Sequence, residues 1–205
     1  MEKIAVIDFE TTGISPNMGA RITEVAVVLV EDGKIVDHYQ SLINAKVRIP
    51  YFIEELTGIT NAMIQSAPPP AKVLPALMEF IGDLPLVAHN ASFDSKFLDA
   101  ELARIKQERR QEFACSMLLA RRLYPVAPNH KLGSLVKHLS LPDSERHHRA
   151  LADARMTAHL MLTLVSEIKD KYGLTMVSHK LLRAIQKAPK AKIQICIEKA
   201  LNSGK

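Results

Sequence analysis

Two strand-like runs separated by only three residues place the strongest constraint on the fold. Residues 21–30 and 34–43 carry many β-branched side chains, and residues 31–33 (Glu-Asp-Gly) stand between them. Asp-Gly supplies the positive φ angles that a tight hairpin turn needs, so we expect the two runs to pair antiparallel. An earlier apolar run, residues 3–9, is stopped by the Thr-Thr-Gly of residues 11–13 and is expected to be a buried central strand.

Helices alternate with short strands after the prolines at positions 68–70. The apolar spacing predicts these elements in order: a helix ending at Ile81, a strand over 84–88, a helix over 92–106, an edge strand over 112–116 and a long helix over 149–171. Gly173 is placed to end the last helix. Antiparallel strands followed by β/α units predict an α/β domain with a mixed sheet flanked by helices.

The charge of the chain is unevenly distributed. Residues 174–205 carry seven Lys or Arg against Glu198, a net charge of +6, so the remainder of the +5 chain carries −1. We expect an α/β domain over residues 1–173 and a basic, helical tail over residues 174–205. The tail either packs on the domain with its lysines in solvent, or contacts a nucleic-acid backbone or an acidic partner without contributing a catalytic group.

The sequence offers no membrane span and no export signal. No stretch approaches the ~18–20 uninterrupted apolar residues of a spanning helix, and residues 1–3 run straight into the first strand. Cys115 and Cys196 lie far apart and lack the spacing of a zinc site or a redox motif. We therefore expect a cytoplasmic protein with free thiols and no membrane partner.

Acidic residues stand at the ends of two predicted strands. Asp8 and Glu10 are two positions apart on the central strand, so both carboxylates point to the same side and favour a bound cation. Asp94 follows Asn90 and Ser92 at the start of a helix, where the alternative is plain helix capping. The carboxyl end of a strand is nevertheless where α/β sheets place ligands.

A histidine and a third acidic position stand at the start of the longest helix. His148 and Asp153 are five residues apart, so we expect His148 in the segment before the helix and Asp153 on it. His148 could then swing over the acids. For the neighbouring His147 we expect a solvated loop side chain.

Together these segments resemble the DEDDh-type 3′–5′ exonucleases, typified by the proofreading epsilon subunit of bacterial DNA polymerase III. The three motifs of that family are similar to residues 8–13 (DFETTG), 89–94 (HNASFD) and 148–153 (HRALAD). Residues 56–60 (LTGIT) resemble the family segment between the first two motifs. The resemblance covers residues 3–170 and implies a ribonuclease H-like fold, in agreement with the order of elements predicted above.

The resemblance also implies a two-metal site. Asp8, Glu10, Asp94 and Asp153 would hold two Mg²⁺ or Mn²⁺ ions, and His148 would accept the proton of the attacking water. Oxygen ligands alone suit such hard cations. By the same resemblance, the terminal nucleotide is contacted by Thr11, Thr12, Leu56 and Ile59.

We therefore expect a phosphodiester hydrolase that releases nucleoside 5′-monophosphates from the free 3′ end of single-stranded or frayed DNA. Its protein partner would be a polymerase or another replication or repair protein. One alternative is an RNA-trimming exonuclease of the same fold, because no residue identified in the sequence distinguishes ribose from deoxyribose. Another is an accessory nucleic-acid-binding subunit of a polymerase. The presence of all five expected catalytic residues argues against this second alternative.

Overall fold

A central mixed sheet organises the protein. The computed structural model describes residues 2–143 and 148–202, with side chains through Lys199. Within the described residues the sheet has five strands in the order β3-β2-β1-β4-β5. The strands are β1 (Ile4–Thr11), β2 (Ile22–Glu31), β3 (Lys34–Leu42), β4 (Leu86–Ala88) and β5 (Phe113–Cys115). The first strand of the chain therefore occupies the middle of the sheet, as predicted.

The direction of the strands changes across β1. β2 pairs antiparallel with both β1 and β3, whereas β4 runs parallel to β1 and to β5. Asp32 and Gly33 have φ angles of 48° and 79°, and they make the turn between β2 and β3. The predicted α/β class, with an antiparallel opening followed by β/α units, is confirmed.

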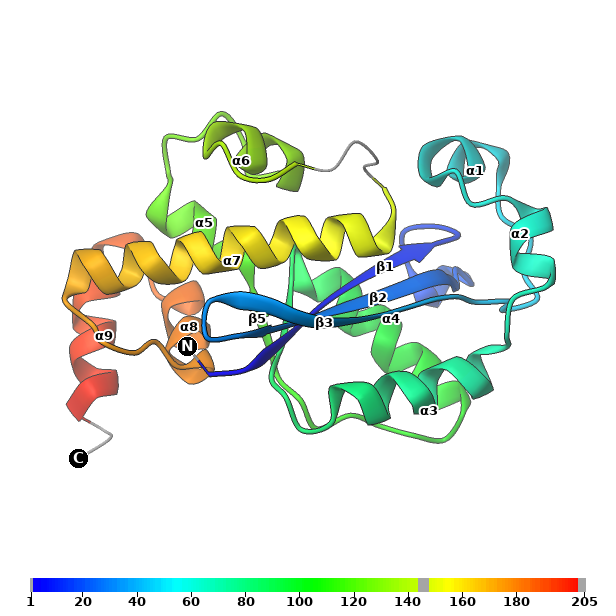
Figure 1. The fold of residues 1–205 in the computed structure, drawn as a ribbon, viewed down its shortest axis with the longest axis horizontal. Coiled ribbons are helices and arrows are strands. Elements are labelled where there is room, and N and C mark those ends of the chain that lie inside the picture. The colour runs from blue at the N-terminus through cyan, green and yellow to red at the C-terminus, as the bar shows by residue number, and fades with distance from the viewer. Residues whose placement is uncertain (1, 144–147, 203–205) are drawn as a thin grey trace.

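Helices cover both faces of the sheet. In chain order they are α1 (Tyr51–Thr57), α2 (Asn61–Gln65), α3 (Pro70–Ile81), α4 (Ala91–Arg104), α5 (Ser116–Leu123), α6 (Leu132–His138), α7 (Ala150–Tyr172), α8 (His179–Lys187) and α9 (Ile193–Asn202), with 3₁₀ turns η1 (Pro16–Met18) and η2 (Lys190–Lys192). α7 lies along one face of the sheet, and α3 and α4 lie on the other (Figure 1). Among the described helices, none is both long and apolar enough to cross a membrane.

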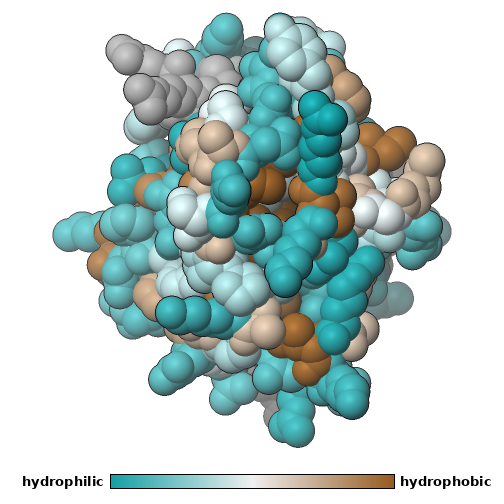
Figure 2. Space-filling model, turned by 90° about the vertical axis from the view of Figure 1, so that its right-hand side faces the viewer, coloured by the Kyte–Doolittle hydropathy of each residue, from teal (hydrophilic) through white to brown (hydrophobic). Residues whose placement is uncertain are grey.

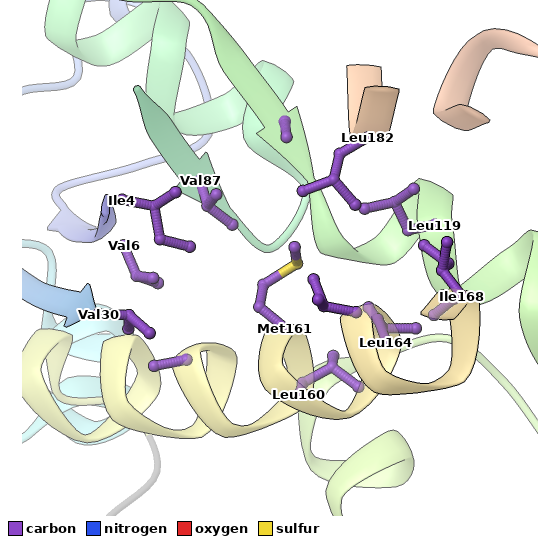
Figure 3. Packing of buried hydrophobic residues seen from close by; sticks show 14 of the residues in the cluster. Ile4, Val6, Val30, Val87, Leu119, Leu160, Met161, Leu164, Ile168 and Leu182 are labelled. Carbon is purple, nitrogen blue, oxygen red and sulfur yellow. The ribbon is translucent and has the colours of Figure 1, made fainter. Parts of the chain in front are cut away.

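β1 is buried on both of its faces and separates two cores. Ile4 and Val6 pack in a cluster with α7, whereas Ala5 and Ile7 pack in a cluster with α3 and α4. Figure 3 shows the first cluster between the sheet and α7. Because side chains alternate along a strand, the next even-numbered positions of β1 also face the α7 side.

The last helices pack into the same core as the rest of the chain. Leu182 of α8 and Ile193 of α9 are buried in the cluster that includes α7. The side chain of Gln186 accepts a hydrogen bond of 2.6 Å from the backbone N–H of Cys115, so α8 covers the outer edge of β5. α9 packs against α8, and its label lies at the same end of the molecule in Figure 1. The division into a domain and a tail at residue 173 stays a prediction.

Candidate active site

One end of the sheet gathers the acidic residues singled out in the sequence. The carboxyl ends of β1 and β4 meet the first turns of α4 and α7 there, where α/β sheets commonly bind ligands. A cavity of about 270 Å³ opens at this end, and it is lined by Asp8, Glu10, Asp94, His148 and Asp153. Figure 2 looks onto this end of the molecule, where hydrophobic residues lie between hydrophilic ones.

β1 presents two carboxylates to the cavity. Asp8 and Glu10 continue the row of side chains that faces α7, and both line the cavity. Glu10 is only 9% exposed, and its cross-strand partner on β2 is Glu24, which is fully buried. Three carboxylates therefore lie close together at the ends of two strands, an arrangement that needs positive charge nearby.

Asp94 reaches the cavity from the first turn of α4. Asn90, which precedes this helix with a φ of 67°, makes no side-chain capping hydrogen bond, so the capping alternative does not hold for it. The Asp94 carboxylate is 2% exposed and accepts hydrogen bonds from the backbone N–H groups of Phe9 and of Asp94 itself. The bond from Phe9 ties α4 to β1 and holds this carboxylate near Asp8.

The N-terminus of α7 brings a further acid and a histidine to the cavity. Asp153 lies in the first turn of α7, and the exposed His148 precedes the helix with a φ of 60°. One ligand atom from each of Glu10, His148 and Asp153 lies within 4.8 Å of the other two. This geometry would let His148 act on a water held by the acids. His147 lies outside the described residues.

The electrostatics of the cavity favour protonated acids when no cation is bound. Burial raises the pKa of Glu10 from 4.5 to about 8, with further increases from Asp153 and Glu24. Burial also raises the pKa of Asp94 from 3.8 to about 8, although its backbone hydrogen bonds oppose the rise. Burial and then the charges of Asp94 and Asp153 raise the pKa of Asp8 well above its usual range. A bound cation would offset these costs, so the donor set fits a metal.

An ion pair between the partly exposed Arg149 and the buried Glu24, which the motifs did not reveal, fastens the start of α7 to β2. Arg149 Nη2 lies 2.8 Å from Glu24 Oε1, and Arg149 Nε lies 3.1 Å from Glu24 Oε2. The same carboxylate accepts hydrogen bonds from the Ala150 N–H at 3.0 Å and from the side-chain amide of Gln40 at 2.8 Å. Arg149 stands between the two site residues of this segment, so the pair helps to position both of them.

His89 lines the cavity but is committed to structural hydrogen bonds. Its Nδ1 lies 2.8 Å from Ser116 Oγ, and its Nε2 lies 2.9 Å from the carbonyl oxygen of His130. Burial lowers the pKa of His89 to about 4, so the ring is neutral at pH 7. Its Nε2–H donates to the carbonyl and its Nδ1 accepts from the hydroxyl. Both ring nitrogens of His89 therefore already have hydrogen-bond partners, so His89 has no free nitrogen to accept a proton from water.

The four residues expected to contact the terminal nucleotide lie in different environments. Thr11 and Leu56 line the cavity, and Leu56 is 51% exposed. Thr12 is buried, and its Oγ1 accepts a hydrogen bond of 2.9 Å from the Arg21 N–H, so its side chain braces the turn after β1. Ile59 is 0% exposed within a small core. The side chain of Ile59 therefore packs beneath α1, and a contact with the terminal nucleotide stays a prediction.

Several lining residues were not singled out in the sequence. Ile53 of α1, Ile14 after β1 and Phe93 of α4 add apolar surface to the cavity. A second hollow of about 180 Å³ shares Ile14 and Phe93 with the first, and Lys96 lines it. Apolar surface beside a cation suits a nucleobase and its phosphate. Ile14 lies in a loop and Ile53 in a short helix, and neither position carries a periodic signal that would have identified it. Phe93 lies within the periodic pattern of α4, which indicated a helix face and not a cavity.

Comparison with known sequences gives matches over most of the chain. A family profile described as exonuclease matches residues 5–161. The DNA polymerase III PolC-type of Clostridium perfringens (strain 13 / Type A) is 39% identical over 173 residues, which are 84% of this chain and 12% of the polymerase. The chain therefore spans only a small part of the length of these curated relatives.

Comparison with solved structures gives matches to nucleases. A structure described as Exonuclease X in complex with 5′ overhanging duplex DNA is 33% identical, with a TM-score of 0.67, over 84% of this chain and 94% of that one. The nuclease domain of 3′hExo, described as a DEDDh family member bound to rAMP, has a TM-score of 0.70 over 81% of this chain and 92% of that one. At 22% identity, the second likeness supports the fold alone.

Proposed function

Because the chain belongs to the exonuclease family, we propose that it hydrolyses the terminal phosphodiester bond at a free 3′ end and releases nucleoside 5′-monophosphates. The proposed substrate is single-stranded or frayed DNA. One observation carries the proposal: Asp8, Glu10, Asp94 and Asp153 converge with His148 on a single cavity. These five residues come from the end of one strand and the starts of two helices, so their meeting is a property of the fold.

Exonucleases of this family depend on divalent cations, and we assign two ions, Mg²⁺ or Mn²⁺, to the four carboxylates. All the carboxylate donors are hard oxygens, which these cations prefer. Burial is the main cause of the raised pKa values of Glu10 and Asp94, and a bound cation would offset this cost of keeping both carboxylates ionised. Asp8, whose pKa is raised by the charges of all three other acids, would be one of the residues that hold the ions. Once bound, the ions would neutralise charge on the phosphate and on the departing 3′ oxygen.

His148 is assigned as the acceptor of the proton from the attacking water. It is exposed at the cavity, with a ring nitrogen within 4.8 Å of ligand atoms of Glu10 and Asp153. Histidine is the side chain that most often serves as a general base in proteins. Glu24 and Arg149 are assigned as positioning residues, because they hold the start of α7 against β2.

The lining of the cavity favours recognition without a preferred base. Thr11 would face the terminal sugar and Leu56 the last base, and neither residue reads a base edge. Similarity to a DNA-bound exonuclease and to PolC-type polymerases favours DNA over RNA and an association with a polymerase, for proofreading or repair. An RNA-trimming enzyme is the second candidate, because the 3′hExo nuclease domain of the same fold is described as bound to rAMP.

The test is release of mononucleotides from matched 5′-labelled DNA and RNA oligomers. We expect a ladder that shortens from the 3′ end with Mg²⁺ or Mn²⁺, no cleavage in chelator, and faster cleavage of DNA. Asp8→Asn and Asp94→Asn should abolish cleavage without changing the circular dichroism spectrum, whereas Asp83→Asn, at an exposed acid, should not. Full activity of either cavity variant, or activity in chelator, would reject the metal assignment.

A further inference from the structure

The outer face of α1 exposes large apolar side chains to solvent. Tyr51 is 72% exposed and Phe52 is 64% exposed, and both are aromatic. Leu56, which lines the cavity, is 51% exposed on the same short helix. Aromatic rings exposed in this way commonly mark a binding surface rather than a part of the fold.

The fold does not need these rings for stability, because α1 is anchored by other residues. Its inner face packs in a small core of four isoleucines, Ile49, Ile53, Ile59 and Ile64. The side-chain oxygen of Asn61 accepts from the Ile49 N–H at 2.8 Å, and its side-chain nitrogen donates to the Ile49 carbonyl at 2.9 Å and to Glu54 at 2.8 Å. α1 is therefore a fixed support, and its outer face is presented to solvent in one orientation.

The exposed face continues directly from the cavity. Phe52 and Leu56 are four positions apart on one helix, so their Cβ atoms lie about 5–6 Å apart on the same side. Ile53, Leu56 and Thr57 already line the cavity from α1. A ligand that contacts Leu56 and extends along α1 therefore meets Phe52 next. Lys46 and Arg48, both exposed, precede α1 and supply positive charge near its start.

A single nucleic-acid strand fits both features of this face. Bases stack on aromatic rings regardless of sequence, and backbone phosphates pair with nearby Lys or Arg. Resting on the function proposed above, we propose that Phe52 stacks on a base immediately 5′ of the terminal nucleotide. Phe52 then serves as a substrate-binding residue that holds the strand while Leu56 contacts the last base.

The proposal can be tested with abasic substitutions along the substrate. KM and kcat are measured for wild type and Phe52→Ala on DNA oligomers with one abasic site at the terminal, second, third or fourth position from the 3′ end. On the intact oligomer, Phe52→Ala should raise KM by about 5- to 30-fold and leave kcat within about two-fold, since stacking acts in binding. Phe52→Trp, which keeps an aromatic face, should restore KM.

The abasic series identifies the contact. At the second position, the abasic site should raise KM for wild type and add little for Phe52→Ala, because both changes remove the same contact. At the third and fourth positions its effect should be the same in both proteins. Ile195→Ala, at a 50% exposed apolar residue of α9, is the control and should behave as wild type. An unchanged KM for Phe52→Ala, or additive effects of the variant and the abasic site at the second position, would overturn the proposal.

A separate measurement distinguishes this proposal from the proposed function. Binding of the same intact oligomer is followed by fluorescence anisotropy in chelator, where no cleavage is expected. Weaker binding by Phe52→Ala together with absent nuclease activity in wild type would reject the proposed function while supporting the stacking contact. Equal binding by both proteins would reject the contact whatever the activity.

Discussion

Replacing Glu10 by Gln should stabilise the protein when no metal is present, even though it removes a residue assigned to the site. Glu10 is 9% exposed, and burial together with Asp153 and Glu24 raises its pKa from 4.5 to about 8. Because the folded pKa lies above the unfolded one, the native state binds the extra proton. The free energy of unfolding therefore falls as pH rises from the unfolded pKa through the folded pKa.

The size of this effect follows from the two pKa values. With about 1.4 kcal/mol per pKa unit, ionisable Glu10 lowers the free energy of unfolding by about 2 kcal/mol at pH 6 and about 4 kcal/mol at pH 8. Gln has nearly the same shape and no charge, so Glu10→Gln should recover most of that difference. The gain should be small at pH 5 and largest near pH 8.

Urea denaturation in chelator at several pH values measures this gain directly. Glu79→Gln, at an exposed acid of α3, is the matched control and should change little. Adding Mg²⁺ should stabilise wild type more than Glu10→Gln, since a ligand that binds only the folded state raises its stability. A Glu10→Gln protein that is less stable at every pH, or a gain that does not grow with pH, would refute the argument that this acid is destabilised by its surroundings.

Three further predictions test other parts of the molecule. His148→Ala should lower kcat by ~10²-fold or more in a steady-state nuclease assay, while His147→Ala should do little, and the reverse ranking would show that the histidines were misassigned. Arg149→Met should lower the free energy of unfolding by about 3–5 kcal/mol in urea denaturation because it leaves Glu24 buried without its cation, and the double change with Glu24→Leu should recover much of that loss. Changing the exposed Lys187, Lys190 and Lys192 to Gln should reduce the slope of log K against log salt for a single strand by about 2 if the tail contacts the substrate backbone, and an unchanged slope would leave those lysines solvated.

Local patterns in the sequence were enough to predict the centre of the fold. The Asp-Gly turn at residues 32–33 and the alternation along β1 and β2 depend on neighbouring residues, so the hairpin and the placement of Asp8 and Glu10 on one side could be read directly. The start of α7 at Ala150 likewise follows from helical spacing, and it places His148 before the helix and Asp153 on it. The family resemblance then grouped acids that are far apart in the chain.

Contacts between distant segments could not be predicted in this way. Glu24 stands within an apolar strand and is separated by 125 positions from Arg149, so no periodicity connects them. The pairing of Glu24 with Glu10 depends on a strand register, which shifts immediately after Glu10. Ile59 and Leu56 look alike as apolar residues of one segment. Only the packing of α1 on its isoleucine core decides which of them faces the cavity.

The packing of α8 on β5 has a consequence for the behaviour of shortened chains. β5 is an edge strand, and edge strands with free backbone groups recruit other chains. Gln186 occupies the N–H of Cys115 on that edge, and Leu182 and Ile185 cover apolar surface beside it. A chain cut after Gly173 would expose the Cys115 N–H and the apolar surface beside it. We expect such a chain to aggregate in a concentration-dependent way during expression, before any defect in nucleotide release could be measured.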